Sequence, residues 1–508
     1  MCQTCIYPVK LICMWNISDK YLNEIKQAFG SEQEFEAFLN SCQMPLKKSI
    51  KINLHKILPK EFVEETKEQG WKLTSSGFVK ENVIPEDVFY VDREDTSIPL
   101  GKTFYHQSWF FYIQEVAAGL SARQLFDTES TGNELILDMS AAPGGKSVQI
   151  WDYLQYLHKD WKLWMVVSND LSKQRLMATG FNLNRMWIFN SIITNFNWFA
   201  FGKNLPEFFD KVLLDAPCSG EWTGFKSDFG LKYWRKEEIN KIASTQYLLL
   251  VSALKTVKPG GVIVYSTCTM NPYENEFNLK RLLDEYAGIV ELEEIFLKEK
   301  DPGLTSWNDE NLLTQEQAEK VARFWPHKQK TWGFFIARLR KIGSLNLKSK
   351  DNKLIWKKWL KFSYDKALQN KVKALLEENF WIKTDDNKHY FVETWNYVYV
   401  VSPLIKDIFW NFDVEKIWTP ILKKNNRWQM RPTHHFGIIF GDLAKKNIVN
   451  VSRDSAYKYW FWNDLEAGES SLENIENPLM NYVVIKYKKW WIGVGKLLDG
   501  RIKNKYLK

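Results

Sequence analysis

The middle of the chain alternates short apolar runs with amphipathic stretches, and this alternation begins near residue 134. The runs with the length and composition of buried strands are ELILDM (134–139), LWMVVSND (163–170), DKVLLDAP (210–217), GVIVYST (261–267) and, later, WGFFIARL (332–339). Apolar residues at helical spacing lie between them, in VQIWDYLQYL (148–157), KQRLMATGFNL (173–183) and a segment at about 236–256. Strands that alternate with helices in this way predict an α/β domain with a doubly wound, largely parallel sheet.

The regions on either side have different patterns. Residues 15–95 are amphipathic and predominantly helical, as in YLNEIKQAF. After about residue 342 the chain is rich in lysine and aromatic residues and becomes strand-like in short pieces. A chain of 508 residues, 45% of them hydrophobic, is long enough for about three domains. We predict three parts, 1–98, 99–342 and 343–508.

Two absences and the charge distribution bear on location and partners. The sequence has neither an apolar run long enough to span a membrane nor a cleavable leader, so we expect a cytoplasmic protein with reduced thiols. From 341 to 508 there are 30 Lys and Arg against 18 Asp and Glu, although the whole chain carries only +8. A basic region interleaved with aromatic residues suits RNA, but a solvated lysine-rich surface explains the charge equally well.

A glycine loop follows the first strand of the predicted sheet. Asp138 ends that strand and SAAPGGKS (140–147) follows it. A phosphate-binding P-loop requires glycine where Ser140 stands, and the dinucleotide fingerprint is absent. The ribose of S-adenosylmethionine instead calls for a carboxylate after the second strand, and Asp170 lies there. Loop and acid together predict a cofactor site at the carboxyl edge of the sheet.

Two of the six cysteines follow strand-like runs. Cys218 comes after the third run and Cys268 after the fourth, so both thiols are expected at one edge of the sheet. A buried cysteine is often only a small hydrophobic residue, but active sites collect at such strand ends. Asp215, three residues before Cys218, is better suited to hold a substrate than to activate a thiol. The remaining cysteines are Cys2, Cys5, Cys13 and Cys42; their spacing does not favour zinc, and we assign no metal.

Four segments carry a family resemblance: DMSAAPGGKS (138–147), NDLSKQRL (169–176), LLDAPCSGE (213–221) and KPGGVIVYSTCTMNPYENE (258–276). Together they closely resemble RNA 5-methylcytosine methyltransferases of the Sun/Nop type, and their order is most similar to the bacterial RsmF-like branch. The resemblance extends from SIKIN (49–53) to GVGKLLDGRIKNKY (493–506) and so covers nearly the whole chain.

The resemblance implies roles for individual residues. Cys268 corresponds to the cysteine that attacks carbon 6 of cytosine, and Cys218 to the cysteine that assists release of the product. Asp215 corresponds to the residue that binds the base edge, with Lys146 near the reacting base. The implied contacts to S-adenosylmethionine are Ala141, Ala142, Pro143, Gly144, Gly145, Lys146, Ser147, Asp170, Asn197 and Asp215.

The sequence departs from the family at four positions. Asn197 stands where the family usually has an aspartate, which we expect to weaken cofactor binding. Trp109, Trp187 and Trp222 stand where resembled sequences have glycine. Either the chain is an aromatic-rich homologue, or its source reads UGA as glycine and the codons were translated as tryptophan. Three glycines replaced by one bulky residue are hard to pack, which favours the second interpretation.

These observations predict a Rossmann-like class I S-adenosylmethionine-dependent methyltransferase domain at 99–342. A helical RNA-binding region precedes it and RNA-guiding, PUA-like modules follow it. The predicted activity is methylation of carbon 5 of an RNA cytosine in 16S ribosomal RNA or the 30S subunit, by a monomer. Three alternatives stay open: a transfer-RNA methyltransferase, a catalytically weakened RNA-binding assembly factor and a P-loop NTPase.

Overall fold

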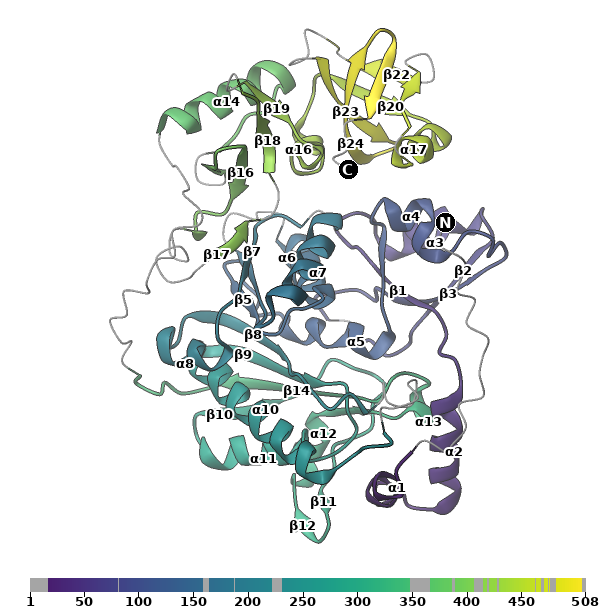
Figure 1. The fold of residues 1–508 in the computed structure, drawn as a ribbon, viewed down its shortest axis with the longest axis vertical. Coiled ribbons are helices and arrows are strands. Elements are labelled where there is room, and N and C mark those ends of the chain that lie inside the picture. The colour runs from purple at the N-terminus through teal and green to yellow at the C-terminus, as the bar shows by residue number, and fades with distance from the viewer. Residues whose placement is uncertain are drawn as a thin grey trace.

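The computed structural model describes residues 17–504, apart from 81, 159–163, 187, 222–230, 348–365, 386–388, 406–413, 418–419, 427–428, 462, 467–469, 474 and 476–480. Its central feature is a mixed sheet in the order β10-β14-β9-β8-β5-β6-β7-β17 (Figure 1). The parallel strands are β5 (Leu135–Asp138), β6 (Met165–Asn169), β7 (Ser191–Thr194), β8 (Phe209–Asp215) and β9 (Val257–Thr267). Beyond β9 the sheet continues with the antiparallel strands β14 (Phe334–Lys341) and β10 (Val290–Glu293).

This sheet confirms the predicted doubly wound α/β class. The chain moves outward from β5 to β7 on one side and from β8 to β9 on the other, so the direction of winding changes between β5 and β8. Ligands bind at such a change, beyond the carboxyl ends of the strands. Strand β7 is not among the strands predicted from the sequence, because its apolar run SIIT is only 4 residues long.

Helices cover both faces of the sheet, and the residues of β5 show why. Leu135 and Leu137 pack in one core with Tyr247 of α10 (Lys236–Thr256). Ile136, pointing the other way, packs in a second core with Val148 of α6 (Gly145–Leu157). Successive side chains of a strand face opposite sides, so an all-apolar strand needs a core on each face. The further layer helices are α7 (Lys173–Arg185) and α11 (Glu276–Glu285).

The N-terminal part contains a sheet that the sequence pattern did not predict. Its helices are α1 (Asp19–Lys26), α2 (Glu32–Gln43) and α3 (Pro59–Lys67). The antiparallel strands pair in the order β2 (Trp71–Ser75), β3 (Val88–Arg93), β1 (Ser49–Ile52) and β4 (Phe111–Ile113). The description of this part as helical is therefore incomplete. Strand β4 pairs with β1 although it lies beyond residue 98, the predicted boundary.

The C-terminal part forms two further sheets (Figure 1, top). The first contains β15 (Tyr390–Glu393), β16 (Tyr397–Val401), β18 (Pro420–Lys424) and β19 (Met430–Pro432), accompanied by α14 (Lys366–Phe380) and α16 (His434–Phe440). The second runs in the order β21 (Leu465–Glu466), β25 (Arg501–Asn504), β24 (Trp490–Leu498), β23 (Tyr482–Tyr487), β20 (Ile448–Val451) and β22 (Ser470–Glu473). A single strand, β17 (Val414–Ile417), crosses to pair with β7 of the central sheet. The likeness of these sheets to PUA modules stays a prediction.

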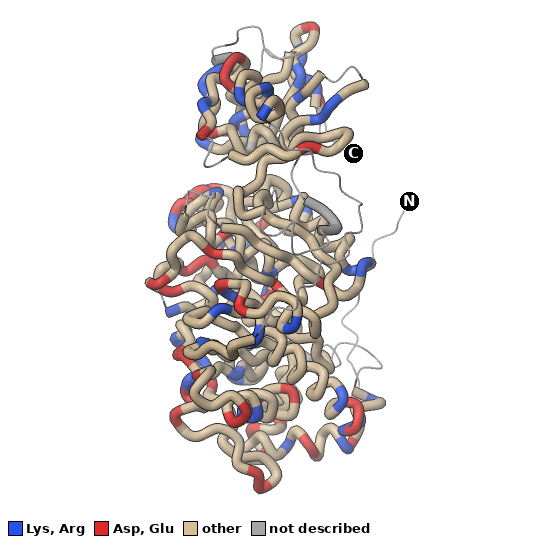
Figure 2. The backbone as a smooth tube through the Cα atoms, turned by 90° about the vertical axis from the view of Figure 1, so that its left-hand side faces the viewer, with Lys and Arg blue, Asp and Glu red and all other residues tan. Residues whose placement is uncertain are grey.

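The second C-terminal sheet packs on the N-terminal part. The ring centroids of Phe104 and Tyr487 lie 5.7 Å apart, and those of Phe110 and Trp490 lie 5.0 Å apart. Figure 2 shows Lys and Arg distributed over the C-terminal sheets, where Asp and Glu also occur, and both signs of charge on the body beneath them. No helix among the described residues is long and apolar enough to cross a membrane.

Candidate active site

The glycine loop lies where the sequence predicts it, between β5 and α6. Ser147 donates a hydrogen bond to Asp138 Oδ2 over 2.6 Å and accepts one from Ser168 over 2.9 Å, which joins the start of α6 to β5 and β6. Gly144 has φ 102°, and a Cβ there would lie 3.2 Å from the Cα of Thr179. Only glycine allows both this backbone conformation and this close approach of α7.

Asp170 directly follows β6 and is fully buried. Its carboxylate accepts hydrogen bonds from the backbone N–H groups of Ala142 (3.3 Å) and Ser172 (2.9 Å). Arg175 donates to the carbonyl oxygen of Ala142 over 2.8 Å. The acid after the second predicted strand is therefore part of the same structure as the glycine loop.

Two polar atoms beside the loop fit a bound ligand. Asp138 Oδ1 and Ser140 Oγ are buried, and in the described part of the chain neither has a hydrogen-bond partner. Buried polar atoms without partners are rare in folded proteins, and at the carboxyl edge of a doubly wound sheet they suit the polar groups of a cofactor. Burial raises the pKa of Asp138 to about 7.

Asn197 lies after β7 and is exposed. Its side-chain oxygen accepts a hydrogen bond of 2.9 Å from the backbone N–H of Phe199 and so caps the short helix η5 (Trp198–Ala200). This local bond engages the oxygen that we expected to face the cofactor. The effect of Asn197 on cofactor affinity stays a prediction.

The two strand-end cysteines come together as expected. Cys218 follows β8 and Cys268 follows β9, which are neighbouring parallel strands. The backbone N–H of Cys268 donates to Cys218 Sγ over 3.4 Å, and both residues are half-buried. A hydrogen bond with the Cys268 thiol, together with burial, raises the pKa of Cys218 above its ordinary value. Cys218 is thereby kept as a protonated thiol beside Cys268.

Lys146 and Asp215 form an ion pair at the same edge. Their Nζ and Oδ2 atoms are 2.7 Å apart, and Ser266 donates to Asp215 Oδ1 over 2.7 Å. Burial opposes the charge of Lys146, but Asp215, then Asp138 and Cys268, raise its pKa above the ordinary value. A positively charged Lys146 therefore lies at the same edge of the sheet as Asp215 and Cys268.

The site also contains polar residues to which the sequence analysis gave no role. Gln246, Glu274 and Asn275 are fully buried around the two cysteine loops. Glu274 and Asn275 belong to the ENE end of the fourth resembling segment (258–276), so this motif was the sequence feature that could have pointed to them.

The remaining predicted positions divide between described and undescribed residues. Cys42 is buried in a core that also contains residues of α1 and α2. Trp109 is buried and has φ 58°. The other named positions lie outside the described residues: Cys2, Cys5, Cys13, Trp187 and Trp222.

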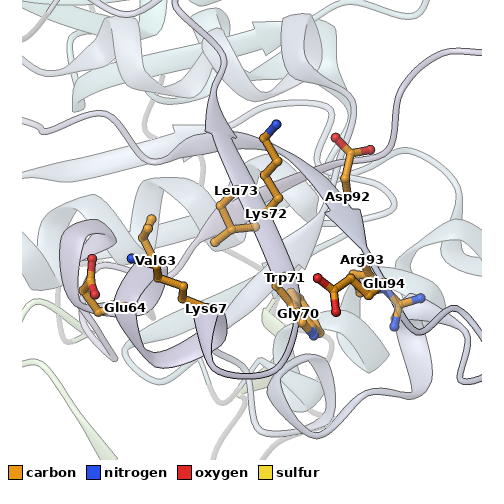
Figure 3. Close-up of a pocket in the computed structure, with 10 residues that line it drawn as sticks. All are labelled: Val63, Glu64, Lys67, Gly70, Trp71, Lys72, Leu73, Asp92, Arg93 and Glu94. Carbon is orange, nitrogen blue, oxygen red and sulfur yellow. The ribbon is translucent and has the colours of Figure 1, made fainter.

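A separate groove of about 600 Å³ lies between α3 and the edge strand β2 (Figure 3). Arg93 lies over the ring of Trp71 there, at 5.4 Å. The charged side chains of its lining are Lys67, Lys72, Arg93, Glu64, Asp92 and Glu94. The balance of signs does not select an anion, and no predicted site residue lines this groove.

Known proteins resemble the chain over nearly its whole length. A family model described as 16S rRNA methyltransferase RsmB/F matches residues 127–340, and one described as the N-terminal domain of 16S rRNA methyltransferase RsmF matches 17–116. The ribosomal RNA small subunit methyltransferase F of Vibrio vulnificus is 31% identical over 507 residues, 96% of each chain. Its counterpart in Aeromonas salmonicida is 30% identical over 497 residues, also 96% of each chain.

Two solved structures from Pyrococcus horikoshii have the same fold. A methyltransferase homologue aligns with a TM-score of 0.50 and 28% identity, over 64% of this chain and all of that one. NSun6 with SFG aligns with a TM-score of 0.52 and 24% identity, over 65% of this chain and 99% of that one. At that identity the second likeness supports the fold alone.

Proposed function

This chain belongs to the RsmF family of S-adenosylmethionine-dependent ribosomal RNA methyltransferases, and from that premise we propose that it methylates carbon 5 of a cytosine in 16S ribosomal RNA through a covalent cysteine adduct. The observation that carries the proposal is the pair of neighbouring cysteines, Cys218 and Cys268, joined by a hydrogen bond from the Cys268 backbone to Cys218 Sγ at the edge where the cofactor loop lies. A methyltransferase that acts on a nucleophilic nitrogen or oxygen has no need of a thiol pair. Carbon 5 of cytosine needs a nucleophile to activate it.

The cofactor fits residues of the glycine loop. Loop residues 141–147 and Asp170 are proposed to hold S-adenosylmethionine, with Asp138 Oδ1 and Ser140 Oγ free to bind its polar groups. When bound, the cofactor supplies a methyl group on a positively charged sulfur. Asp170 already accepts two backbone hydrogen bonds, so its carboxylate is oriented before any ligand arrives.

Cys268 is proposed as the nucleophile. Its thiolate forms a bond to carbon 6 of cytosine, and the electrons of the carbon 5–carbon 6 double bond make carbon 5 reactive toward the methyl group. Asp215 binds the base edge around N3 and the exocyclic amine, while Lys146 holds Asp215 in place. Loss of the carbon-5 proton then re-forms the double bond and expels the Cys268 thiolate.

Cys218 is proposed to assist this last step. Its raised pKa keeps it a thiol at neutral pH, so it does not compete as a nucleophile; it donates its proton to the departing Cys268 sulfur, and its own sulfur takes up the carbon-5 proton in exchange. The two cysteines thus have separate proposed tasks, attack for Cys268 and release for Cys218.

One gel assigns the two roles. Cys218→Ser should still permit attack and methyl transfer but slow elimination, so the enzyme accumulates as a slower band on a denaturing gel that RNase removes. Cys268→Ser should give no such band. The reverse pattern would exchange the roles, and no band in either variant would contradict the covalent mechanism.

Two of the alternatives remain as second candidates. Asn197, in place of the aspartate usual in the family, favours a weakened enzyme acting mainly as an RNA-binding assembly factor. A transfer-RNA substrate is the other. Bisulfite sequencing of total RNA from cells with and without the gene distinguishes them: a single lost 16S site supports our proposal, a lost transfer-RNA site replaces the substrate, and no lost site supports the assembly factor.

Membership of a methyltransferase family leaves no support for a P-loop NTPase. We place the reaction in the cytoplasm, and a monomer stays a prediction.

A further inference from the structure

Three consecutive residues after β9 are fully buried although all are polar: Glu274, Asn275 and Glu276. They precede and begin α11, next to the two cysteine loops. Buried carboxylates and amides are costly unless every polar atom is engaged, so the partners of these side chains indicate why they are there.

Glu274 and its neighbour Gln246 hold both sides of Cys218. The backbone N–H of Ser219 donates to Glu274 Oε2 over 2.9 Å. Gln246 Nε2 donates to the same oxygen over 2.7 Å and to the carbonyl oxygen of Pro217 over 2.9 Å. The peptide groups immediately before and after Cys218 are therefore attached to one pair of buried side chains.

Asn275 holds both sides of Cys268 in the same way. The hydroxyl of Thr267 donates to Asn275 Oδ1 over 2.5 Å, and Asn275 Nδ2 donates to the carbonyl oxygen of Thr269 over 3.1 Å. Both threonines are fully buried. Two consecutive residues thus bind the chain after two neighbouring strands: Glu274 binds the loop after β8, and Asn275 binds the loop after β9.

Two further contacts fix the segment itself. Glu276 forms a two-pronged ion pair with Arg323, whose Nη1 also donates to the carbonyl oxygen of Met270 over 2.7 Å. Asn271 Nδ2 lies 2.6 Å from Glu274 Oε1 and 3.0 Å from Glu221 Oε1, so it bridges the two acids. Burial, and next the charge of Glu274, raises the pKa of Glu221 to about 7. Repulsion between the two carboxylates is thereby reduced at neutral pH.

We propose that Glu274 and Asn275 are positioning residues that set the relation of the two thiols, Glu274 acting through Cys218 and Asn275 acting through Cys268. The inference rests on the proposed covalent mechanism. It adds that attack and release are controlled separately, by two adjacent residues that touch neither RNA base nor cofactor.

Single substitutions separate the two effects. Each partner of the Glu274 carboxylate named above is a donor, so Glu274→Gln turns an NH₂ group toward another donor and loosens the Cys218 loop. Asn275→Ala removes both hydrogen bonds that flank Cys268. A displacement of about 1 Å in a catalytic group slows its step on the order of tenfold to a hundredfold.

The first readout is the covalent RNA adduct. Glu274→Gln should accumulate more adduct than the wild type, because release slows more than attack. Asn275→Ala should slow attack, so that Asn275→Ala combined with Cys218→Ser forms adduct roughly tenfold or more slowly than Cys218→Ser alone. Matched controls are Glu134→Gln and Asn190→Ala, which change buried residues just before the amino ends of β5 and β7, at the opposite edge of the sheet.

A second readout does not depend on methyl transfer. Mild diamide oxidation of the full-length protein, followed by peptide mass spectrometry, measures formation of a Cys218–Cys268 disulfide. Both clamp variants, Glu274→Gln and Asn275→Ala, should form it several-fold more slowly than the wild type and the controls. Melting curves with and without S-adenosylmethionine check that the variants fold and bind cofactor.

The outcomes divide cleanly. Opposite changes in adduct, with slowed disulfide formation confined to the clamp variants, support the inference. Adduct changes in the same direction, or a wild-type disulfide rate in folded clamp variants, overturn it. If Cys218→Ser itself gives no adduct, the proposed mechanism fails, and the disulfide rates still decide whether Glu274 and Asn275 position the thiols.

Discussion

At the scale of single residues, the proposed role of Cys268 as nucleophile is one that no neighbouring group can take over. We expect Cys268→Ala to lower methylation by roughly a thousandfold or more, because Cys218, with its raised pKa, is a poor replacement nucleophile. S-adenosylmethionine affinity should stay within about threefold of the wild type, since the thiol is proposed to contact the base and not the cofactor. Isothermal titration and tritium transfer to RNA measure the two quantities. Methylation at more than a tenth of the wild-type rate contradicts the assignment.

Trp109 raises a different residue-scale question, because its backbone has φ 58° and its side chain is buried. The left-handed region suits glycine and is strained for a bulky residue. The backbone of Trp381 is also in the left-handed region, at φ 53°. We expect the codons of Trp109, Trp187 and Trp222 to be UGA, read as glycine in the source. Sequencing the gene decides the matter, as UGG at these three positions refutes the interpretation.

At the scale of elements, a buried ionic cluster joins strand β1 of the N-terminal sheet to helix α6, which begins at the cofactor loop. Lys51 on β1 forms an ion pair with Asp152 on α6 and lies 3.6 Å from Asp87. The backbone N–H of Leu54 and the ring of His55 also donate to Asp152. Although burial opposes ionisation, Lys51 and then His55 lower the pKa of Asp152 well below its ordinary value.

Breaking this pair should be costly because it leaves a buried charge. We expect Lys51→Met to lower the free energy of unfolding by about 3 to 5 kcal/mol, whereas Lys51→Met with Asp152→Leu should recover most of the loss. Urea unfolding of the single and double variants gives the comparison. A single variant as stable as the wild type would show that the cluster does not hold β1 to α6.

At the scale of the whole molecule, the N-terminal part and the last sheet share a core, and a half-buried lysine lies where they meet. Lys56 donates to the carbonyl oxygen of Trp491 over 2.8 Å and lies over the ring of Phe110 at 5.4 Å. Burial lowers the pKa of Lys56 to about 7, with Asp442 opposing the shift. The protonation of one side chain is therefore coupled to the contact between segments more than 400 residues apart.

This coupling sets a pH dependence. Unfolded Lys56 keeps its proton up to about pH 10.4, so between pH 7 and 10 the unfolded state binds more protons and stability rises with pH, by up to about 1.4 kcal/mol per unit. Lys56→Met should flatten this rise, while Lys445→Met, at an exposed position, should not. Melting temperatures at pH 7, 8 and 9 test it. Equal slopes for Lys56→Met and the wild type would exclude Lys56 as the titrating group.

The amino-acid order alone was enough to place the proposed site, because the signals for it are local. A strand, a glycine loop and a helix follow one another within about 25 residues, and parallel strands place their carboxyl ends at one edge whatever the remaining chain does. For this reason the order of residues along the chain is enough to assign Asp138, Asp170, Cys218 and Cys268 to one site. The short strand β7 was not predicted, because a run of four residues does not distinguish a strand from a loop.

Tertiary structure alone decided the rest. The N-terminal sheet pairs β1 with β4, some 60 residues apart, and register at that range leaves no periodic trace in either segment. Glu274 and Asn275 look like ordinary polar residues before a helix until their burial and partners are known. The packing of Tyr487 and Trp490 on Phe104 and Phe110 depends on complementary surfaces from opposite ends of the chain, and such complementarity arises only once both are folded.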